Sequence, residues 1–271
     1  MTTFRNLIVV MAASALAFVP FAAGQSTITM SATYYTIAAG DQDMGHLAGG
    51  VFANEVRSTL GSDGLPVLNT AAFGCASGCF TNTPLPADLT AGGEITWWSP
   101  GLNRGGSGGA SDVVQTGTGT VTLPFNNASF FPPNGTGPND ASGFQAAVFS
   151  GTIYVPTTES ISFNLGSDDV VFVYLDGTVA CQIGGVHTIS STTCTSGALT
   201  QGFHTLQLFY SDIAPTLAGL TFSITTPGIV NPAPTPTPTL SEWGLMLLAG
   251  LLAGAGAIEL RRRRHAAPLE R

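Results

Sequence analysis

Short stretches of the chain alternate apolar and polar residues with a period of two. Between residues 152 and 224 this pattern recurs in residues 160–165, 205–210 and 220–224. Successive side chains of a β-strand point to opposite faces of the sheet, so the alternation predicts half-buried antiparallel strands. Apolar residues follow a helical spacing convincingly only within residues 51–60. The pattern therefore predicts an all-β fold, an antiparallel β-sandwich, with one short helix at residues 51–60.

One run is apolar throughout, since residues 170–175 read Val-Val-Phe-Val-Tyr-Leu. Asp168 and Asp169 precede this run, and an Asp176-Gly177 pair, typical of a tight turn, follows it. A short apolar run bounded in this way predicts a strand buried inside the sandwich. Two neighbouring carboxylates at the start of a strand are suitable ligands for a hard cation. The stretch therefore predicts a binding loop on a β-scaffold.

The middle of the chain, residues 92–139, is rich in Gly, Asn and Pro, which predicts long loops. Within these loops the glycine cluster around Ser107 formally matches the G-x-S-x-G nucleophile elbow of hydrolases. That motif needs a strand before the serine and a helix after it, and the sequence predicts neither. The sequence also contains no nucleotide-binding loop and no zinc-protease helix motif. We therefore expect a protein that is not an enzyme.

The chain is acidic and has few basic residues outside its ends. Among its 271 residues there is no lysine, and Arg57 and Arg104 are the only arginines between Arg5 and Arg261. Thirteen Asp and Glu residues lie between positions 25 and 239. Such a domain has nothing that could neutralise phosphates, which argues against nucleic acid as a partner. An acidic surface suits an exported protein that meets divalent cations or neutral sugars, although plain solubility accounts for the charge equally well.

The N-terminus has the layout of a secretory signal peptide, which we assign to residues 1–24. A basic residue precedes an apolar run over residues 7–19, and small residues then suit cleavage before Gln25. The mature chain is therefore expected to be exported, with its folded domain over residues 25–226.

The four cysteines fit an oxidising compartment. Three disulfide pairings are formally open to Cys75, Cys79, Cys181 and Cys194. The preferred pairing joins Cys75 to Cys79 and Cys181 to Cys194, because local bridges are favoured. A zinc site is the alternative, but no second Cys pair or His pair follows at the spacing of metal fingers.

The C-terminal part reads as a stalk followed by a membrane segment. Residues 227–238 are rich in Pro and Thr, which favours an extended polyproline geometry. Residues 243–258 would form a single transmembrane helix of about 24 Å, shorter than the roughly 30 Å hydrocarbon core, so the helix is a weak stop. The basic cluster that follows it holds the cytoplasmic tail, residues 265–271, inside. That cluster consists of Arg261, Arg262, Arg263 and Arg264.

In residues 239–264, together with Pro238 just before them, a short motif, an apolar helix and the arginine cluster occur in a fixed order. The motif residues are Pro238, Thr239, Leu240, Ser241, Glu242, Trp243 and Gly244. This tail resembles the IPTL-CTERM protein-sorting signal, with Thr237 in place of the leading Ile. The resemblance implies a Gram-negative bacterium, recognition at the inner membrane by an exosortase-type protease, and delivery to the envelope or an extracellular polymer layer. A permanent single-pass anchor is the alternative.

Three segments of the exported part resemble the fibro-slime domain, a branch of the PA-fourteen (protective-antigen-type) β-sandwich family. They are residues 49–67, residues 167–187, and residues 202–224, the last of which looks like a closing hairpin. The resemblance covers residues from about Ser31 to Thr225. It implies a β-sandwich and names no particular member of the family.

In sugar-binding members of that family a paired Asp holds a calcium ion, which in turn ligates sugar hydroxyls. The resemblance places Asp168 and Asp169 in this role, with a cis peptide that turns both carboxylates toward one ion. Asp212 is the nearest further ligand, because calcium takes about six to eight oxygens, while the family's second calcium loop is not recognisable here. The alternative needs no metal: Asp168 would cap a turn and Asp169 would lie in solvent. His187 is expected to be structural.

These expectations combine into one functional prediction. The protein is expected to be an exported, non-enzymatic component of the envelope or extracellular matrix that binds carbohydrate or another surface ligand, with calcium as its cofactor. Its partners would be a glycan or extracellular polymer, the processing protease and, transiently, the inner membrane. The alternatives are a purely structural matrix component and an accessory module of a glycan hydrolase.

Overall fold

The computed structural model describes most of residues 27–231 and a few residues of the C-terminal tail. It separates the chain into two units, Met1–Asn231 and Pro232–Arg271. The described residues are 27–45, 49–71, 88–127, 143–215 and 217–231, with residues 247–248, 250–253, 258 and 261 in the second unit. The predicted signal peptide, residues 1–24, lies outside them.

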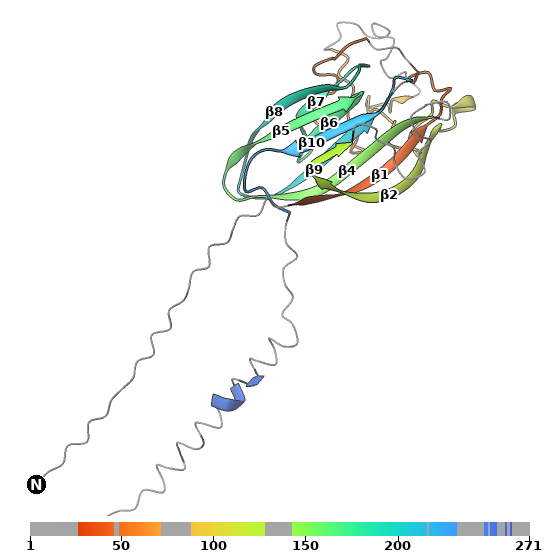
Figure 1. Cartoon of the computed structure of the whole chain (residues 1–271). Helices are drawn as coiled ribbons and strands as arrows, with labels where there is room; N and C mark the ends of the chain where they lie inside the picture. The colour runs from red at the N-terminus through yellow and green to blue at the C-terminus, as the bar shows by residue number, and fades with distance from the viewer. Residues whose placement is uncertain are drawn as a thin grey trace, which may run out of the picture. The chain divides into compact units, whose positions relative to one another are not determined.

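The first unit is an antiparallel β-sandwich of two sheets (Figure 1). The larger sheet has the strand order β2-β1-β4-β9-β6-β7, and the smaller sheet has the order β3-β10-β5-β8. The strands of the larger sheet are β1 (Ile28–Ile37), β2 (Val113–Leu123), β4 (Phe144–Val155), β6 (Val170–Leu175), β7 (Thr178–Ile183) and β9 (Gly202–Ser211). Those of the smaller sheet are β3 (Phe125–Asn127), β5 (Glu159–Asp168), β8 (Ser190–Leu199) and β10 (Gly219–Ile224).

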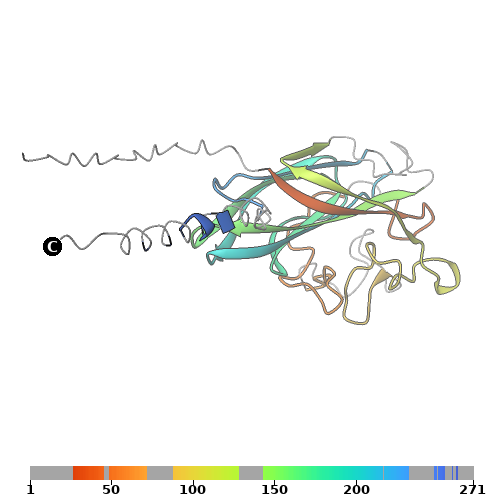
Figure 2. The ribbon, with the colours of Figure 1, turned by 90° about the horizontal axis from the view of Figure 1, so that it is seen from below.

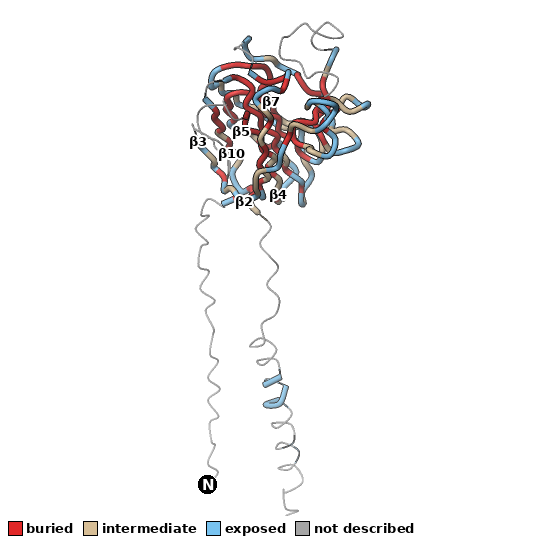
Figure 3. Tube along the Cα trace, turned by 90° about the vertical axis from the view of Figure 1, so that its right-hand side faces the viewer, coloured by how far each residue is buried: buried red, intermediate tan, exposed pale blue. Residues whose placement is uncertain are grey.

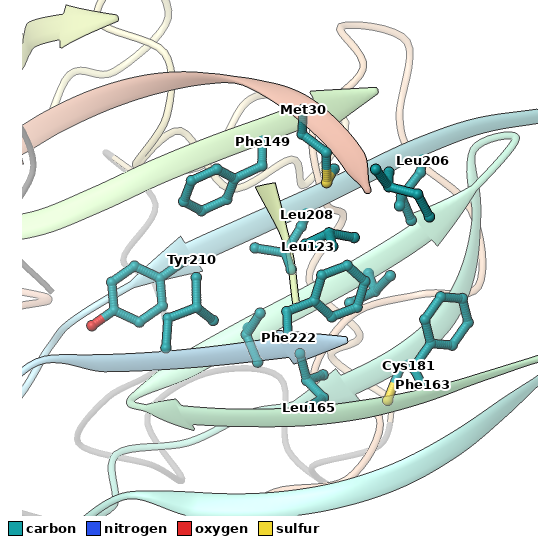
Figure 4. Close-up of a cluster of buried hydrophobic side chains, with 14 of the residues drawn as sticks. Met30, Leu123, Phe149, Phe163, Leu165, Cys181, Leu206, Leu208, Tyr210 and Phe222 are labelled. Atoms are coloured by element: carbon teal, nitrogen blue, oxygen red, sulfur yellow. The ribbon is translucent and has the colours of Figure 1, made fainter. Parts of the chain in front are cut away.

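The main core lies between the two sheets, and the alternating segments of the sequence supply it. In β5, for example, Ile161, Phe163 and Leu165 are buried, while the residues between them are half-buried or exposed. Strands β9 and β10 contribute Leu208 and Phe222 to the same cluster (Figure 4). The alternation therefore correctly predicted these three strands and their inward faces.

The other face of the larger sheet is covered by loops, which form a second hydrophobic cluster that includes Trp97 and Trp98. Figure 2 shows these loops, coloured orange to yellow, gathered on one side of the strands. Strand β6 lies between the two clusters, and all six of its residues are buried. Figure 3 shows buried residues, coloured red, along much of the strands of the sandwich. The continuously apolar run thus becomes a strand covered on both faces, as predicted. It closes with the predicted turn, in which Asp176 and Gly177 both have positive φ.

The helix predicted over residues 51–60 is wrong. This segment instead forms isolated bridges, in which Phe52 pairs with Gly184 and Val56 pairs with Leu68. The amide of Val56 donates to the side-chain oxygen of Gln182 at 3.1 Å. Backbone pairing with neighbouring loops thus overrides the local apolar spacing. In the first unit, the structure describes a short 3-10 turn, η2 (Ser107–Gly109), which lies outside this segment.

The long loops predicted over residues 92–139 are interrupted by two strands that the sequence did not predict, β2 and β3. Strand β2 is rich in Thr and Gly, and most of its residues are exposed or half-buried. It lies at one edge of the larger sheet, where it pairs with β1 alone. An edge strand with so little buried surface carries no strong apolar alternation, which is why its sequence resembles a loop.

The predicted closing hairpin over residues 202–224 is not formed either. Strand β9 pairs with β4 and β6 in the larger sheet, whereas β10 pairs with β3 and β5 in the smaller one. The chain therefore crosses from one sheet to the other between Ser211 and Gly219. Each strand packs its apolar face into the shared core from the opposite side, which hairpin partners in a single sheet could not do.

The predicted disulfide between Cys181 and Cys194 is confirmed, with a Cα–Cα distance of 5.5 Å. Cys181 lies on β7 and Cys194 on β8, the edge strands of the two sheets. The bridge therefore joins the sheets along one side of the sandwich. The predicted bridge between Cys75 and Cys79 lies outside the described residues.

Residues 227–231, which the sequence assigns to the stalk, extend the folded unit. Ile229 is buried in the main core, and Val230 forms a bridge with Tyr154. The apolar pair explains the difference, because burying it against the sandwich removes its surface from water.

Among the tail residues that are described, no helix is both long and apolar enough to cross a membrane. The transmembrane helix predicted over residues 243–258 stays a prediction.

A candidate cation site where the chain changes sheets

Three carboxylates meet where the chain passes from one sheet to the other. Strand β5 of the smaller sheet ends at Asp168, and β6 of the larger sheet begins at Val170, directly after Asp169. Val170 pairs with Ser211 of β9. Because the strands are antiparallel, Asp169, just before Val170, lies opposite Asp212, just after Ser211. One carboxylate oxygen from each of Asp168, Asp169 and Asp212 lies within 4.8 Å of the others.

Asp169 is held by the backbone through both of its carboxylate oxygens. Oδ1 accepts the amide of His187 at 2.6 Å. Oδ2 accepts the amides of Ile213 and Ala214 at 2.8 and 2.6 Å. Three N–H donors from two separate loops thus fix the orientation of one side chain. The alternative in which Asp169 lies in solvent is therefore wrong.

Asp168 is held in a different way. Its backbone carbonyl accepts the hydroxyl of Tyr210, and its carboxylate accepts the amide of Ile189. The peptide bond between Asp168 and Asp169 is cis, as the family resemblance implied. The hydrogen bond from Ile189 comes from the residue just before β8, the strand paired with β5, so it is not the cap of a local turn that was expected for Asp168. The proximity of the three carboxylates is a further difference from that metal-free alternative.

The electrostatic environment disfavours three negative charges in the absence of a counterion. Asp168, Asp169 and Asp212 are 3%, 0% and 0% exposed. Burial, together with the neighbouring charge of Asp169, raises the pKa of Asp168 to about 7. Burial also raises the pKa of Asp169, although its hydrogen bonds from backbone amides oppose the shift. A buried charge is stable only when it is paired, hydrogen-bonded or bound to a metal, so this cluster is a good receptor for a cation.

The loop that contacts Asp169 is itself anchored by Glu55, a residue that the sequence did not single out. Glu55 is buried, and its Oε2 accepts the amide of Gly185 at 2.5 Å. Burial raises the pKa of Glu55 to about 7, and the charge of Asp169 adds to this shift. A Cβ atom at Gly184 would overlap the Glu55 carboxylate, which explains the glycine. Glu55 was missed because it falls in the segment where the sequence predicted a helix.

His187 is positioned as a structural residue, in agreement with the expectation. Its amide donates to Asp169, its Nδ1 lies 2.8 Å from the carbonyl of Thr188, and its ring is buried. The residue therefore joins the acidic cluster to the start of β8 through its backbone. No contact of its ring with the three carboxylates is needed to explain its position.

The donor set fits calcium. All three ligands are carboxylates, the oxygen donors that hard cations prefer, and calcium accepts irregular coordination by about six to eight oxygens. Zinc sites and most transition-metal sites use His or Cys, and this cluster has neither. The three carboxylates would fill part of the coordination sphere. A calcium ion would supply positive charge to the cluster and could accept further oxygens from water or a ligand.

The family model of the IPTL-CTERM motif matches residues 235–264 of the chain. This match confirms the sorting signal predicted from Pro238 to Gly244 and the cluster that begins at Arg261. It covers only the C-terminal part of the chain. No curated protein matches the chain.

Several solved structures match the chain at low similarity. The PA14 sugar-binding domain from an RTX adhesin is 13% identical, with 73% of this chain and 89% of that chain covered and a TM-score of 0.34. The epithelial adhesin 9 A domain from Candida glabrata, in complex with Galβ1-4GlcNAc, is 10% identical over 76% of this chain and 86% of that chain, with a TM-score of 0.33. A β-glucosidase from Kluyveromyces marxianus is 11% identical over 31% of this chain and only 11% of its own, with a TM-score of 0.26. Likeness at this level gives no information on ligand or activity.

Proposed function

We propose that this protein is an exported, non-enzymatic carbohydrate-binding protein of the cell envelope or extracellular matrix. In this proposal Asp168, Asp169 and Asp212 hold a calcium ion, and the ion binds hydroxyl groups of a sugar. The observation that carries the proposal is the convergence of three buried carboxylates at the crossover between the sheets. The sorting motif supports delivery to the cell surface.

The chemistry of such a site follows from the needs of calcium. The three carboxylates leave part of a sphere of about six to eight oxygens to be filled, and two neighbouring sugar hydroxyls can supply two oxygens. Ile189 and Leu217, which are 54% and 57% exposed, lie beside the site and could cover the apolar face of a sugar ring. Ile189 donates its amide to Asp168, and Leu217 lies two residues before Gly219, which pairs with Asp168.

The tail sets the proposed route of the chain. After export of residues 25–231, the helix over residues 243–258 would stop in the inner membrane of a Gram-negative bacterium. An exosortase-type protease would then release the domain on its Pro and Thr stalk. The match of the sorting motif supports this order of events.

One observation favours a second candidate function, in which the ion is purely structural. Asp169 and Asp212 are fully buried, which leaves little access for a ligand. The protein would then be a structural matrix component whose calcium fixes the crossover and takes no sugar.

A glycan array read with calcium and with EGTA tests the proposal on the full chain in mild detergent. The wild type and Asp63→Asn, which changes an exposed carboxylate, should bind the same glycans in calcium and lose them in EGTA. Asp168→Asn should lose glycan binding in both conditions. Thermal unfolding measured beside the array should show a calcium-dependent rise in the unfolding free energy that is larger in the wild type than in Asp168→Asn, by about 2.7 kcal/mol at 100 times the Kd of the crossover site.

The two candidate functions give different results. Calcium-dependent stability that Asp168→Asn reduces, without any glycan signal, would support the structural ion and reject sugar binding. If calcium changed neither glycan binding nor stability, both candidates would be rejected.

A further inference from the structure

A second group of carboxylates lies on the loops that cover the larger sheet. Asp41 follows β1, Asp88 lies at the start of the described segment 88–127, and Asp112 directly precedes β2. One oxygen from each lies within 4.8 Å of the others. Asp41 and Asp88 are 5% and 1% exposed, and Asp112 is half-buried. We call these residues the loop cluster.

A buried amide organises the loop cluster. Asn103 donates from Nδ2 to Oδ1 of Asp88 at 2.8 Å, while its Oδ1 accepts the amides of Gly105 and Asp112, each at 3.2 Å. Asn103 itself is fully buried. Its side chain therefore holds two of the three acidic residues in place. The amide of Asp43 donates to Oδ1 of Asp41 at 2.6 Å and fixes the third.

Two of the converging oxygens have no donor. In the described part of the chain, Oδ2 of Asp41 and Oδ1 of Asp112 are buried and have no N–H donor, and the two carboxylates lie within hydrogen-bonding reach of each other. Arg104 is the nearest arginine in sequence, and its guanidinium binds the carbonyl of Asn103 instead. Two buried acceptors that face each other need either a shared proton or a cation, because a buried polar atom without a partner is costly.

The backbone leaves a space in front of these oxygens at Gly105. A Cβ atom there would overlap Oδ1 of Asp88 and would lie 3.1 Å from both Oδ1 of Asp112 and Oδ2 of Asp41. The three oxygens therefore converge on the space that a side chain would otherwise fill. Gly105 does not have a positive φ, so close approach explains the glycine and backbone conformation does not.

We propose that the loop cluster is a second calcium site, formed by Asp41, Asp88 and Asp112 in front of Gly105. An ion there would join three segments that are distant in sequence and have little regular structure. It would fix them over the hydrophobic cluster that contains Trp97 and Trp98. The donor set is all carboxylate, without His or Cys, which favours calcium over zinc.

The main rival is a proton shared by Asp41 and Asp112. Burial, with the charges of Asp88 and Asp112, raises the pKa of Asp41 to about 7, so a shared proton is chemically reasonable. The two explanations differ in what the protein binds. A shared proton needs no metal, whereas the proposed site takes up one calcium ion per chain.

The test is a count of bound calcium on the full chain, by equilibrium dialysis and isothermal titration calorimetry. The wild type and the exposed-carboxylate control Asp63→Asn should bind two ions per chain. Asp168→Asn and the double variant Asp41→Asn, Asp112→Asn should each bind one, and the combination of all three substitutions should bind none. If the crossover site bound no calcium, the wild type would bind one ion. The double variant Asp41→Asn, Asp112→Asn would lose that ion, and Asp168→Asn would keep it. Unchanged binding in the loop-cluster variant would overturn the proposal.

A neutral substitution protects the test from a variant that fails to fold. Gly105→Ala fills the space in front of the three oxygens and should weaken calcium binding at the loop cluster by about tenfold or more. Gly101→Ala is the matched control on the same loop, because nothing lies within 4 Å of its Cβ position and its φ is not positive. Near-ultraviolet circular dichroism would confirm that both variants are folded. Equal calcium affinity in the two alanine variants would contradict the proposed site.

Discussion

Asp168 and Asp169 are neighbours in sequence but are held by different contacts. Three backbone amides bind the carboxylate of Asp169, whereas a single amide binds that of Asp168. Asp169 therefore ties together the loops that follow β7 and β9, whether or not an ion is present. Asp168 has the more open carboxylate and is better suited to bind an ion.

The first prediction is that Asp169→Asn destabilises the fold more than Asp168→Asn. Both oxygens of Asp169 accept hydrogen bonds, so the amide group of the substituted side chain would point its own NH2 at an N–H donor in either orientation. Leaving a buried donor unsatisfied costs about 1–3 kcal/mol. Urea denaturation in EGTA should show a loss of about 2 kcal/mol or more for Asp169→Asn. Equal stability of the two variants would contradict this account.

The second prediction concerns the ion pair between His204 and Asp176. Nδ1 of His204 lies 2.6 Å from Oδ2 of Asp176, and Nε2 lies 2.8 Å from the carbonyl of Thr200. The hydrogen bond with Asp176 is the main cause that raises the pKa of His204. A raised folded pKa means that the pair stabilises the fold below the ordinary histidine pKa of 6.5, and that this stability is lost as pH rises through the folded pKa.

Asp176→Asn tests this pH dependence, because Asn tolerates the positive φ of the turn. The wild type should exceed the variant in unfolding free energy by more at about pH 5.5 than at about pH 9. Urea denaturation across this range, in EGTA, measures the difference. A difference that stays constant or grows with pH would reject the assigned role.

At the scale of elements, the disulfide joins the two sheets through their edge strands. Cys181 of β7 and Cys194 of β8 lie 13 residues apart. A bridge that closes a loop of this length reduces the entropy of the unfolded chain, which is worth about 3 kcal/mol. The smaller sheet is therefore tied to the larger one by a covalent bond as well as by the core.

The third prediction is that Cys181→Ala with Cys194→Ala lowers the unfolding free energy by about 3 kcal/mol. Urea denaturation under oxidising conditions measures the loss. Dithiothreitol should then destabilise the wild type by more than the double variant, and its residual effect on the variant reports any contribution of Cys75 and Cys79. A loss smaller than about 0.5 kcal/mol would show that the bridge adds little.

The sequence predicts those strands that bury at least one face in the core. It does not predict the edge strand β2, which buries little of its surface. The alternation in β5 and β9 and the apolar run of β6 follow directly from burial on one or both faces. Strand β2 exposes most of its Thr and Gly side chains, so its sequence gives no such signal. The false helix at residues 51–60 has apolar residues at helical spacing, but its backbone bonds to other loops.

At the scale of the whole molecule, the two acidic sites differ in how far the sequence reveals them. Asp168 and Asp169 are adjacent and follow a recognisable pattern, and Asp212 lies at the end of the next paired strand. The loop cluster brings together residues 41, 88 and 112, which no local motif connects. The three carboxylates come together only because the irregular loops that carry them cover the larger sheet, and that arrangement is a property of the tertiary structure alone.

The place where the stalk leaves the domain has a mechanical consequence. The chain from Asp212 to Asn231 runs through β10, whose first residue, Gly219, pairs with Asp168 of β5. If a ligand were held at the acidic crossover, a tensile force on the stalk would therefore act along β10. The six residues of this strand would have to slide past β3 and β5, which loads their hydrogen bonds in shear and breaks them together. Forced unfolding is governed by the unfolding rate, so this geometry slows unfolding under load.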